Sequence, residues 1–134
     1  MKKIILFFII LHFPLVIYGG NYLCIEDITT GLQKQQNGEW KLRRLVESKY
    51  LVSFENNSLK SVKRFGSDKN ICDEFKNSQK YNISQCIQSD LGRIVRVFEF
   101  HTISKRFTQV FIPGYTENIS GNTPSISSGK CSSF

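Results

Sequence analysis

Short runs of β-branched and aromatic residues recur along most of the chain, and they constrain its fold more than any other feature. In several runs apolar and polar side chains alternate, which is the period of a strand with one buried face. Asn, Gly and Ser residues separate the runs, as turns between strands require. The pattern predicts seven strands, at residues 22–28, 40–46, 49–54, 59–65, 92–101, 106–112 and 125–127.

This spacing predicts a mainly β fold, a small antiparallel β-sandwich or barrel-like domain with at most one short helix. The best place for the helix is residues 68–80, because Asp68 would cap it and Ile71 and Phe75 would share one face. The chain of 134 residues suits one domain, which we place at residues 20–134. We expect the core to contain the largest apolar members of the runs: Trp40, Leu42, Tyr50, Val52, Phe98, Phe107 and Phe111.

Four cysteines are present, an even number in a short chain, and they predict two disulfides. Of the three pairings, we favour Cys24 with Cys131, which fastens both ends, and Cys72 with Cys86, which closes a polar stretch. The two crossed pairings would leave that stretch open or the tail free. There is no C-x₂-C spacing and one histidine beyond residue 19, so we expect neither a metal site nor a cofactor.

The first 19 residues have the pattern of a signal peptide. Lys2 and Lys3 precede an apolar run at residues 4–18, and the small residue Gly19 suits cleavage. The alternative is a membrane anchor, but this run is shorter than the roughly 20 residues that a span needs, and His12 and Pro14 interrupt it. We therefore expect a secreted or periplasmic protein with no stable membrane insertion once the leader is removed.

Basic residues outnumber acidic ones by 18 to 11, which gives a net charge of +7. Many fall on or beside predicted strands, and on a shared face they would attract lipid headgroups or polyanionic glycans. Arg96, Phe98 and Phe100 alternate along one strand, as basic and aromatic residues do on sheets that bind single-stranded nucleic acid. No nucleic-acid-binding motif occurs, so nucleic acid is not an expected partner. The candidate anion-binding residues are Arg43, Arg44, Lys63, Arg64, Arg93, Arg96, Lys105 and Arg106.

One histidine could support catalysis, because His101 is the only imidazole beyond the leader. Glu99 lies two residues earlier, so both would share one strand face as an acid–base pair, as in a small secreted hydrolase. No second part of a catalytic site is visible, and no catalytic residue is therefore assigned. Acidic neighbours such as Glu26 and Asp27 point to opposite faces of a strand, and we expect them to be solvated.

Two ends of the chain carry a resemblance to a known group of proteins. The first has Tyr22-x-Cys24 and Thr30-Gly31-Leu32, and the second has Gly129-Lys130-Cys131-Ser132. These motifs resemble an uncharacterised family of short exported proteins from bacterial and phage-associated genomes. The resemblance implies an exported β protein and supplies no activity. The combined expectation is a non-enzymatic binding or interaction protein whose partner is another protein or an anionic surface, with the hydrolase as the alternative.

Overall fold

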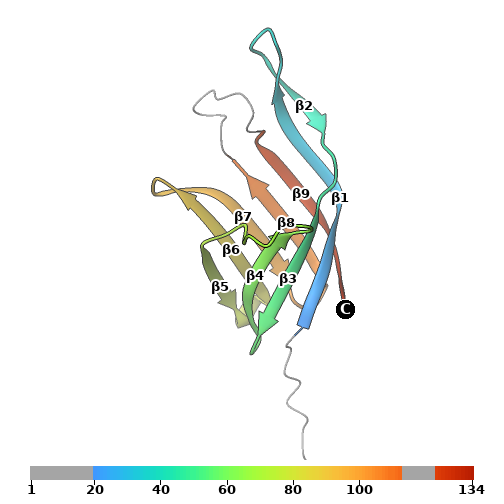
Figure 1. Cartoon of the computed structure of the whole chain (residues 1–134), viewed down its shortest axis with the longest axis vertical. Helices are drawn as coiled ribbons and strands as arrows, with labels where there is room; N and C mark the ends of the chain where they lie inside the picture. Colours follow the sequence, from blue (N-terminus) through green and yellow to red (C-terminus); the bar gives the residue numbers. More distant parts are fainter. Residues whose placement is uncertain (1–19, 113–122) are drawn as a thin grey trace, which may run out of the picture.

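The computed structural model describes residues 20–112 and 123–134, and these residues are mostly in β-strands (Figure 1). The predicted signal peptide, residues 1–19, lies outside the described residues. Within them the only helix is one 3₁₀ turn, which is far too short to cross a membrane. The elements are β1 (Gly20–Lys34), β2 (Trp40–Arg44), β3 (Lys49–Glu55), β4 (Ser58–Arg64), β5 (Glu74–Ser78), η1 (Gln79–Tyr81), β6 (Ile83–Asp90), β7 (Arg93–His101), β8 (Arg106–Phe111) and β9 (Ser125–Ser133).

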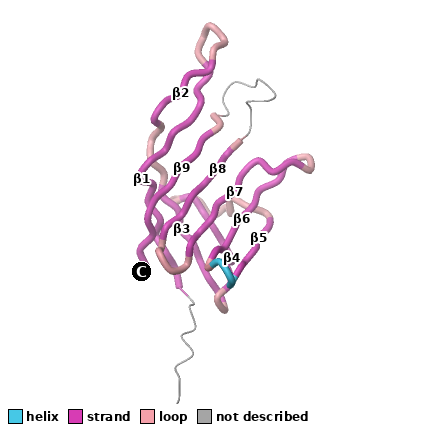
Figure 2. The backbone as a smooth tube through the Cα atoms, turned by 180° about the vertical axis from the view of Figure 1, so that it is seen from behind, coloured by secondary structure: helices cyan, strands magenta, loops and turns pink. Residues whose placement is uncertain are grey.

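The strands form one antiparallel sheet that curls into a nearly closed, barrel-like shape (Figures 1 and 2). Its order is β4-β3-β1-β9-β8-β7-β6-β5, and among the described strands β2 pairs with β1 alone. The C-terminal strand β9 therefore lies in the middle of the sheet, between β1 and β8. The prediction of a mainly antiparallel, barrel-like β fold with two disulfides is confirmed.

The segment between β4 and β5, residues 65–73, joins the two ends of the curled sheet, and we call it the closing segment. The Ile71 N–H donates to the Val62 carbonyl of β4 at 2.8 Å, and the Asp73 N–H donates to a carbonyl of β6 at 2.8 Å. From β5, the Asn77 side-chain oxygen accepts a hydrogen bond from the Leu59 N–H of β4 at 3.0 Å. The closure thus depends on this connecting segment and on one amide side chain.

Both predicted disulfides are present. Cys24 on β1 and Cys131 on β9 lie directly opposite each other in neighbouring strands, with Cα atoms 3.9 Å apart. Cys72 lies in the closing segment and is bonded to Cys86 on β6, with Cα atoms 5.5 Å apart. One disulfide fastens the two terminal strands together, and the other fastens the closing segment to the barrel wall. Two disulfides are consistent with an oxidising, extracellular compartment.

Aromatic rings from β3, β7 and β8 fill the middle of the barrel. Phe98 and Phe107 stack with ring centroids 5.0 Å apart, and the Tyr50 ring packs edge-on against both. Val52 is buried beside them in the same core. These four predicted core residues are confirmed.

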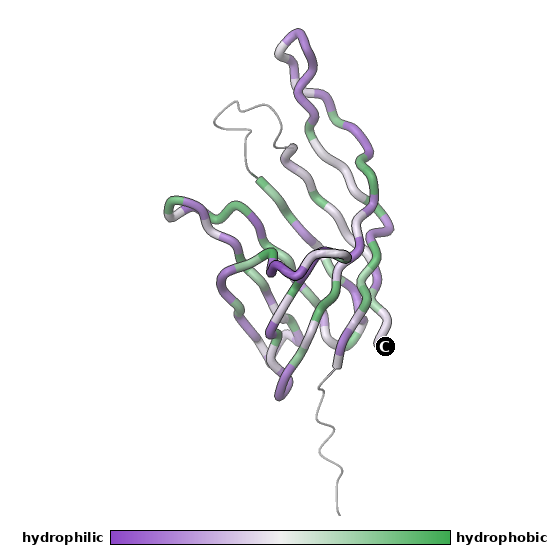
Figure 3. The backbone as a smooth tube through the Cα atoms, in the orientation of Figure 1, coloured by the Kyte–Doolittle hydropathy of each residue, from purple (hydrophilic) through white to green (hydrophobic). Residues whose placement is uncertain are grey.

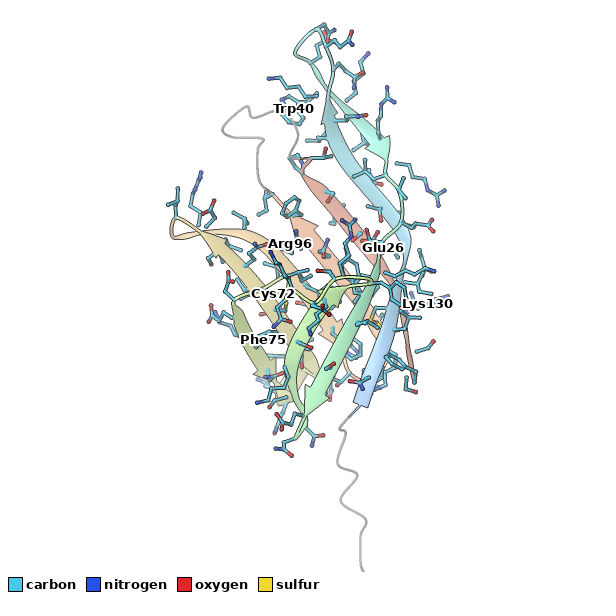
Figure 4. The ribbon with its side chains drawn as sticks, in the orientation of Figure 1. Glu26, Trp40, Cys72, Phe75, Arg96 and Lys130 are labelled. Carbon is cyan, nitrogen blue, oxygen red and sulfur yellow. A yellow bond between two sulfur atoms is a disulfide. The ribbon has the colours of Figure 1, made fainter. Side chains whose placement is uncertain are left out.

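Three other residues expected in the core lie outside the core cluster, and two of them, Trp40 and Leu42, are on the β1–β2 hairpin, which projects beyond the rest of the sheet. Many of the residues in this projection are hydrophilic (Figure 3). Leu42 is consequently 71% exposed, and Trp40 near the tip is only partly buried (Figure 4). Phe111 is also only partly buried, at the end of β8.

The predicted helix at residues 68–80 is wrong. This stretch holds the closing segment, strand β5 and the 3₁₀ turn η1. Pairing of β5 with β6 and the Cys72–Cys86 disulfide outweigh the local capping pattern. Strand β6 was also missed, because the residues it buries toward the core, Ser84 and Cys86, are small and give no strong apolar alternation.

An irregularity in β1 changes which of its residues face the interior. The pairing with β9 shifts between Glu26 and Ile28, which leaves Asp27 as an extra residue. Glu26 and Thr29 are therefore both buried, although three positions separate them. Gly129 lies opposite Glu26, and any side chain there would clash with the β1 main chain. The expectation that Glu26 is a solvated acid is wrong, since it is 3% exposed.

Candidate functional site

Two cavities open at opposite ends of the barrel-like sheet. The larger has a volume of about 600 Å³ and lies where β1 begins, β3 ends and the β5–β6 and β7–β8 connections turn. The smaller, of about 170 Å³, lies where β3 and β7 begin and β4 and β8 end. We call them the aromatic cavity and the polar cavity. The aromatic cavity is lined by Tyr22, Phe54, Asn57, Asn77, Ser78, Gln79, Asn82, Ile83, Ser84, Phe100, Thr102, Ile103 and Lys105. The polar cavity is lined by Glu26, Thr29, Leu45, Val46, Ser48, Tyr50, Arg64, Arg96, Gln109, Phe111 and Ser125.

Three packed rings contribute to the wall of the aromatic cavity. Tyr22, Phe54 and Phe100 come from β1, β3 and β7, and their centroids are 5.2 to 5.8 Å apart. Phe100 is fully buried, and Phe54 is only partly covered. Because each ring is held by the other two, this wall is apolar and fixed in place.

Lys105 brings a positive charge to the aromatic cavity. Its ammonium group donates to the Tyr22 hydroxyl at 3.1 Å and lies 4.8 Å from the centre of that ring. The Lys105 main chain has a left-handed φ of 53° and donates to the His101 carbonyl, which fixes the end of the β7–β8 turn. Among the described residues that line this cavity, Lys105 carries the only formal charge.

Polar side chains surround the rest of the opening. Asn57 lies in the β3–β4 turn, and Gln79 and Asn82 lie between β5 and β6. The Asn82 carbonyl accepts hydrogen bonds from both the main chain and the hydroxyl of Thr102, at 2.8 and 3.2 Å. This contact ties the β5–β6 connection to the β7–β8 turn, so two sides of the opening are held together.

A buried carboxylate lines the polar cavity. Glu26 accepts hydrogen bonds from the Thr29 hydroxyl at 2.6 Å, the Ser48 N–H at 2.6 Å and the Tyr50 hydroxyl at 3.0 Å. Three donors compensate for the loss of water around this charge. Burial raises the pKa of Tyr50, and the negative charge of Glu26 raises it further.

Two guanidinium groups reach the same cavity. Arg96 stacks over the Phe111 ring at 4.5 Å, and Arg64 donates to the Ser48 hydroxyl at 2.7 Å. Burial lowers the pKa of Arg96, and the like charge of Arg64 contributes in the same direction. Figure 4 shows Arg96 and Glu26, which come from β7 and β1.

The predicted anion-binding residues are spread over several parts of the molecule. Arg64 and Arg96 come together at the polar cavity, and Lys105 lies at the aromatic cavity. Arg43 and Arg44 lie on the projecting β2, where Arg44 forms an exposed ion pair with Glu47 at 2.9 Å. The others are placed on separate elements: Lys63 on β4, Arg93 at the start of β7 and Arg106 at the start of β8. The predicted alternation of Arg96, Phe98 and Phe100 faces the barrel interior.

The candidate acid–base pair lies on the outer side of β7. Glu99 accepts a hydrogen bond from the Gln85 amide at 2.9 Å. His101 contacts Ser104 instead, where its Nδ1 accepts from the Ser104 N–H at 3.1 Å and lies 3.0 Å from the hydroxyl. Because Nδ1 accepts this main-chain hydrogen bond, His101 acts locally as a cap for the β7–β8 turn. Neither residue lines the two described cavities.

The sequence did not indicate that Glu26, Tyr50 and Gln109 would line one cavity. They come from β1, β3 and β8, and their proximity depends on strand order and on the irregularity at Asp27. Within the described part of the chain, no group of three or more His, Cys, Asp or Glu side chains is arranged to hold a metal ion.

Comparison with models of protein families, with curated proteins and with solved structures finds no match to this chain. The resemblance to a family of short exported proteins therefore stays a prediction.

Proposed function

We propose that this protein is a non-enzymatic binding protein that holds a small amphipathic ligand in the aromatic cavity. The ligand would have an apolar body, such as a short acyl chain or a single ring, and one anionic group. The observation that carries the proposal is a cavity of about 600 Å³ with aromatic rings in its wall and Lys105 as its charged residue.

The size and lining of the cavity support this ligand class. Pockets for small molecules measure about 300–1,000 Å³ and combine apolar walls with a few placed polar groups. The ends of small barrels are a common place for them. The apolar body would lie against Phe54 and the neighbouring rings, and the amides of Asn57 and Gln79 would remain near solvent.

Lys105 supports the choice of an anionic group over a neutral or cationic one. Its ammonium is positioned by the Tyr22 hydroxyl, so little side-chain freedom would be lost when a ligand binds. An ammonium–carboxylate hydrogen bond in a partly buried site contributes about 1.5–3 kcal/mol, which is roughly tenfold or more in affinity.

Calorimetric titration of residues 20–134 with octanoate and with 1-octanol tests the proposal. We expect octanoate to bind more tightly than octanol, and Lys105→Met to weaken octanoate binding about tenfold while changing octanol binding little. Methionine matches the four-atom apolar stem of the lysine side chain and removes the ammonium group. Lys130→Met is the matched control, because Lys130 is exposed on β9 and does not line the cavity (Figure 4).

The failure of octanoate to bind would contradict the proposal. Equal effects of the Lys105 and Lys130 substitutions would also contradict it, since net charge alone would then explain the preference. Circular dichroism of each variant shows whether the β fold is retained.

We propose further that the protein is exported. Residues 1–19 have the pattern of a cleavable leader, and the two disulfides support an oxidising compartment. Expression of the full chain in a bacterium with an export pathway, followed by intact-mass measurement, should give a protein that begins at or within a residue or two of Gly20. Recovery of the uncleaved chain from the membrane fraction would contradict export.

A further inference from the structure

Two residues that line the polar cavity, and one residue next to them, have a buried polar atom without a hydrogen-bond partner. Within the described part of the chain these are the Arg96 Nε, the Gln109 Oε1 and the Ser127 hydroxyl. Gln109 and Ser127 are 7% and 3% exposed and are paired across β8 and β9. Buried polar groups are nearly always hydrogen-bonded, so the two unpartnered atoms of cavity-lining residues, Arg96 Nε and Gln109 Oε1, point to a missing partner in the cavity.

Gln109 lines the same cavity as Tyr50 and Glu26. The Tyr50 hydroxyl donates its proton to Glu26, so it cannot also donate to Gln109. The Gln109 Oε1 has no hydrogen-bond partner among the described residues, and an amide oxygen needs a donor.

The charges around the polar cavity favour an anion. Glu26 contributes one negative charge, and Arg64 and Arg96 contribute two positive charges, so the sum over these three lining residues is +1. The Glu26 carboxylate is already satisfied by three donors. One more negative charge would neutralise the site and provide an acceptor for the Arg96 Nε.

We infer that the polar cavity is a second binding site, for a small oxyanion that also carries an O–H donor. The oxyanion would accept hydrogen bonds from Arg96, and its hydroxyl would donate to the Gln109 Oε1. A volume of about 170 Å³ corresponds to five or six water molecules at about 30 Å³ each, which limits the ligand to a few non-hydrogen atoms. Small hydroxycarboxylates and hydrogen phosphate share this chemistry.

The polar cavity differs from the aromatic cavity in size, in charged groups and in position. It is smaller, its charge comes from guanidinium groups, and it lies at the other end of the strands. The two proposals can therefore fail independently of each other.

Titration of residues 20–134 with glycolate, acetate and inorganic phosphate tests the inference, with binding followed by NMR at the Gln109 side-chain amide. We expect glycolate or phosphate to shift this signal and acetate to bind at least tenfold more weakly, because acetate has no hydroxyl for Gln109. Comparison of the shifts caused by glycolate and by phosphate shows whether the site prefers a small hydroxycarboxylate or hydrogen phosphate. This comparison of anions needs no variant.

Arg96→Met should abolish the response, and Arg93→Met is the matched control because Arg93 is exposed on the same strand and does not line the cavity. Equal binding of acetate and glycolate would overturn the inference. No shift with glycolate or phosphate would overturn it as well, since water alone would then fill the cavity. Binding that survives Arg96→Met would place the anion elsewhere.

Discussion

Tyr50 and Glu26 share a hydrogen bond inside the barrel, and this contact links the stability of the protein to pH. Burial, the charge of Glu26 and their hydrogen bond all raise the pKa of Tyr50 above its ordinary value. Tyr50 therefore holds its proton more tightly in the folded chain than in the unfolded one. Its contribution to stability is complete below about pH 10, the ordinary tyrosine pKa, and is lost as the pH rises through the higher folded-state value.

Urea unfolding from about pH 8 to pH 11 should consequently show the free energy of unfolding fall above about pH 10. Tyr50→Phe should make this fall shallower, because phenylalanine has no proton to lose. Tyr81→Phe should leave it unchanged, since Tyr81 is 59% exposed. The same slope in the wild type and in Tyr50→Phe would show that the buried tyrosine does not control the alkaline loss of stability.

Phe107 and Leu42 are both large apolar residues of predicted strands, but only one is in the core. Phe107 stacks on Phe98 and is 2% exposed, whereas Leu42 lies on the projecting hairpin. Phe107→Ala should lower the free energy of unfolding by about 3–5 kcal/mol, and Leu42→Ala by less than about 1 kcal/mol. Chemical denaturation measures both. Similar losses would mean that the hairpin is packed against another part of the molecule.

At the level of elements, the sequence predicted the strands with strong alternation and missed those without it. The runs that became β3, β4, β7 and β8 were predicted nearly to their ends. β5 and β6 were missed because a polar edge strand and a strand with small buried residues lack the apolar signal. Only long-range pairing and the Cys72–Cys86 disulfide make them strands. The same reason explains the wrong helix at residues 68–80.

The closing segment should be the part of the sheet that depends most on a disulfide. Replacing Cys72 and Cys86 with alanine leaves hydrogen bonds as the links of the segment to β4 and β6, among them those of the Ile71 and Asp73 main chains. We expect the amides of β5 to exchange with solvent at least tenfold faster, while those of β1 and β9 change little. Hydrogen-exchange NMR measures both regions. Uniform acceleration throughout the sheet would indicate a global loss of stability and contradict a local role.

For the whole molecule, the sequence predicted the fold class and both disulfides but not the cavities. Alternation and cysteine spacing are local or pairwise signals, and they were sufficient for a barrel-like sheet with fastened ends. The cavities are formed by residues of many strands, and their position depends on how the sheet curls. Lys105, Arg64 and Arg96 were identified as anion-binding candidates, but their division between two interior sites follows only from the strand order.

NMR titration of residues 20–134 with octanoate, followed at the main-chain amides, tests the central proposal most directly. If the aromatic cavity binds an amphipathic anion, the amides of Ser84, Thr102 and Lys105 should shift, and those of Thr29 and Gln109 at the other end should not. The shifts should saturate with a single affinity. Shifts spread over the outer surface, or confined to the Glu26 end, would contradict the account.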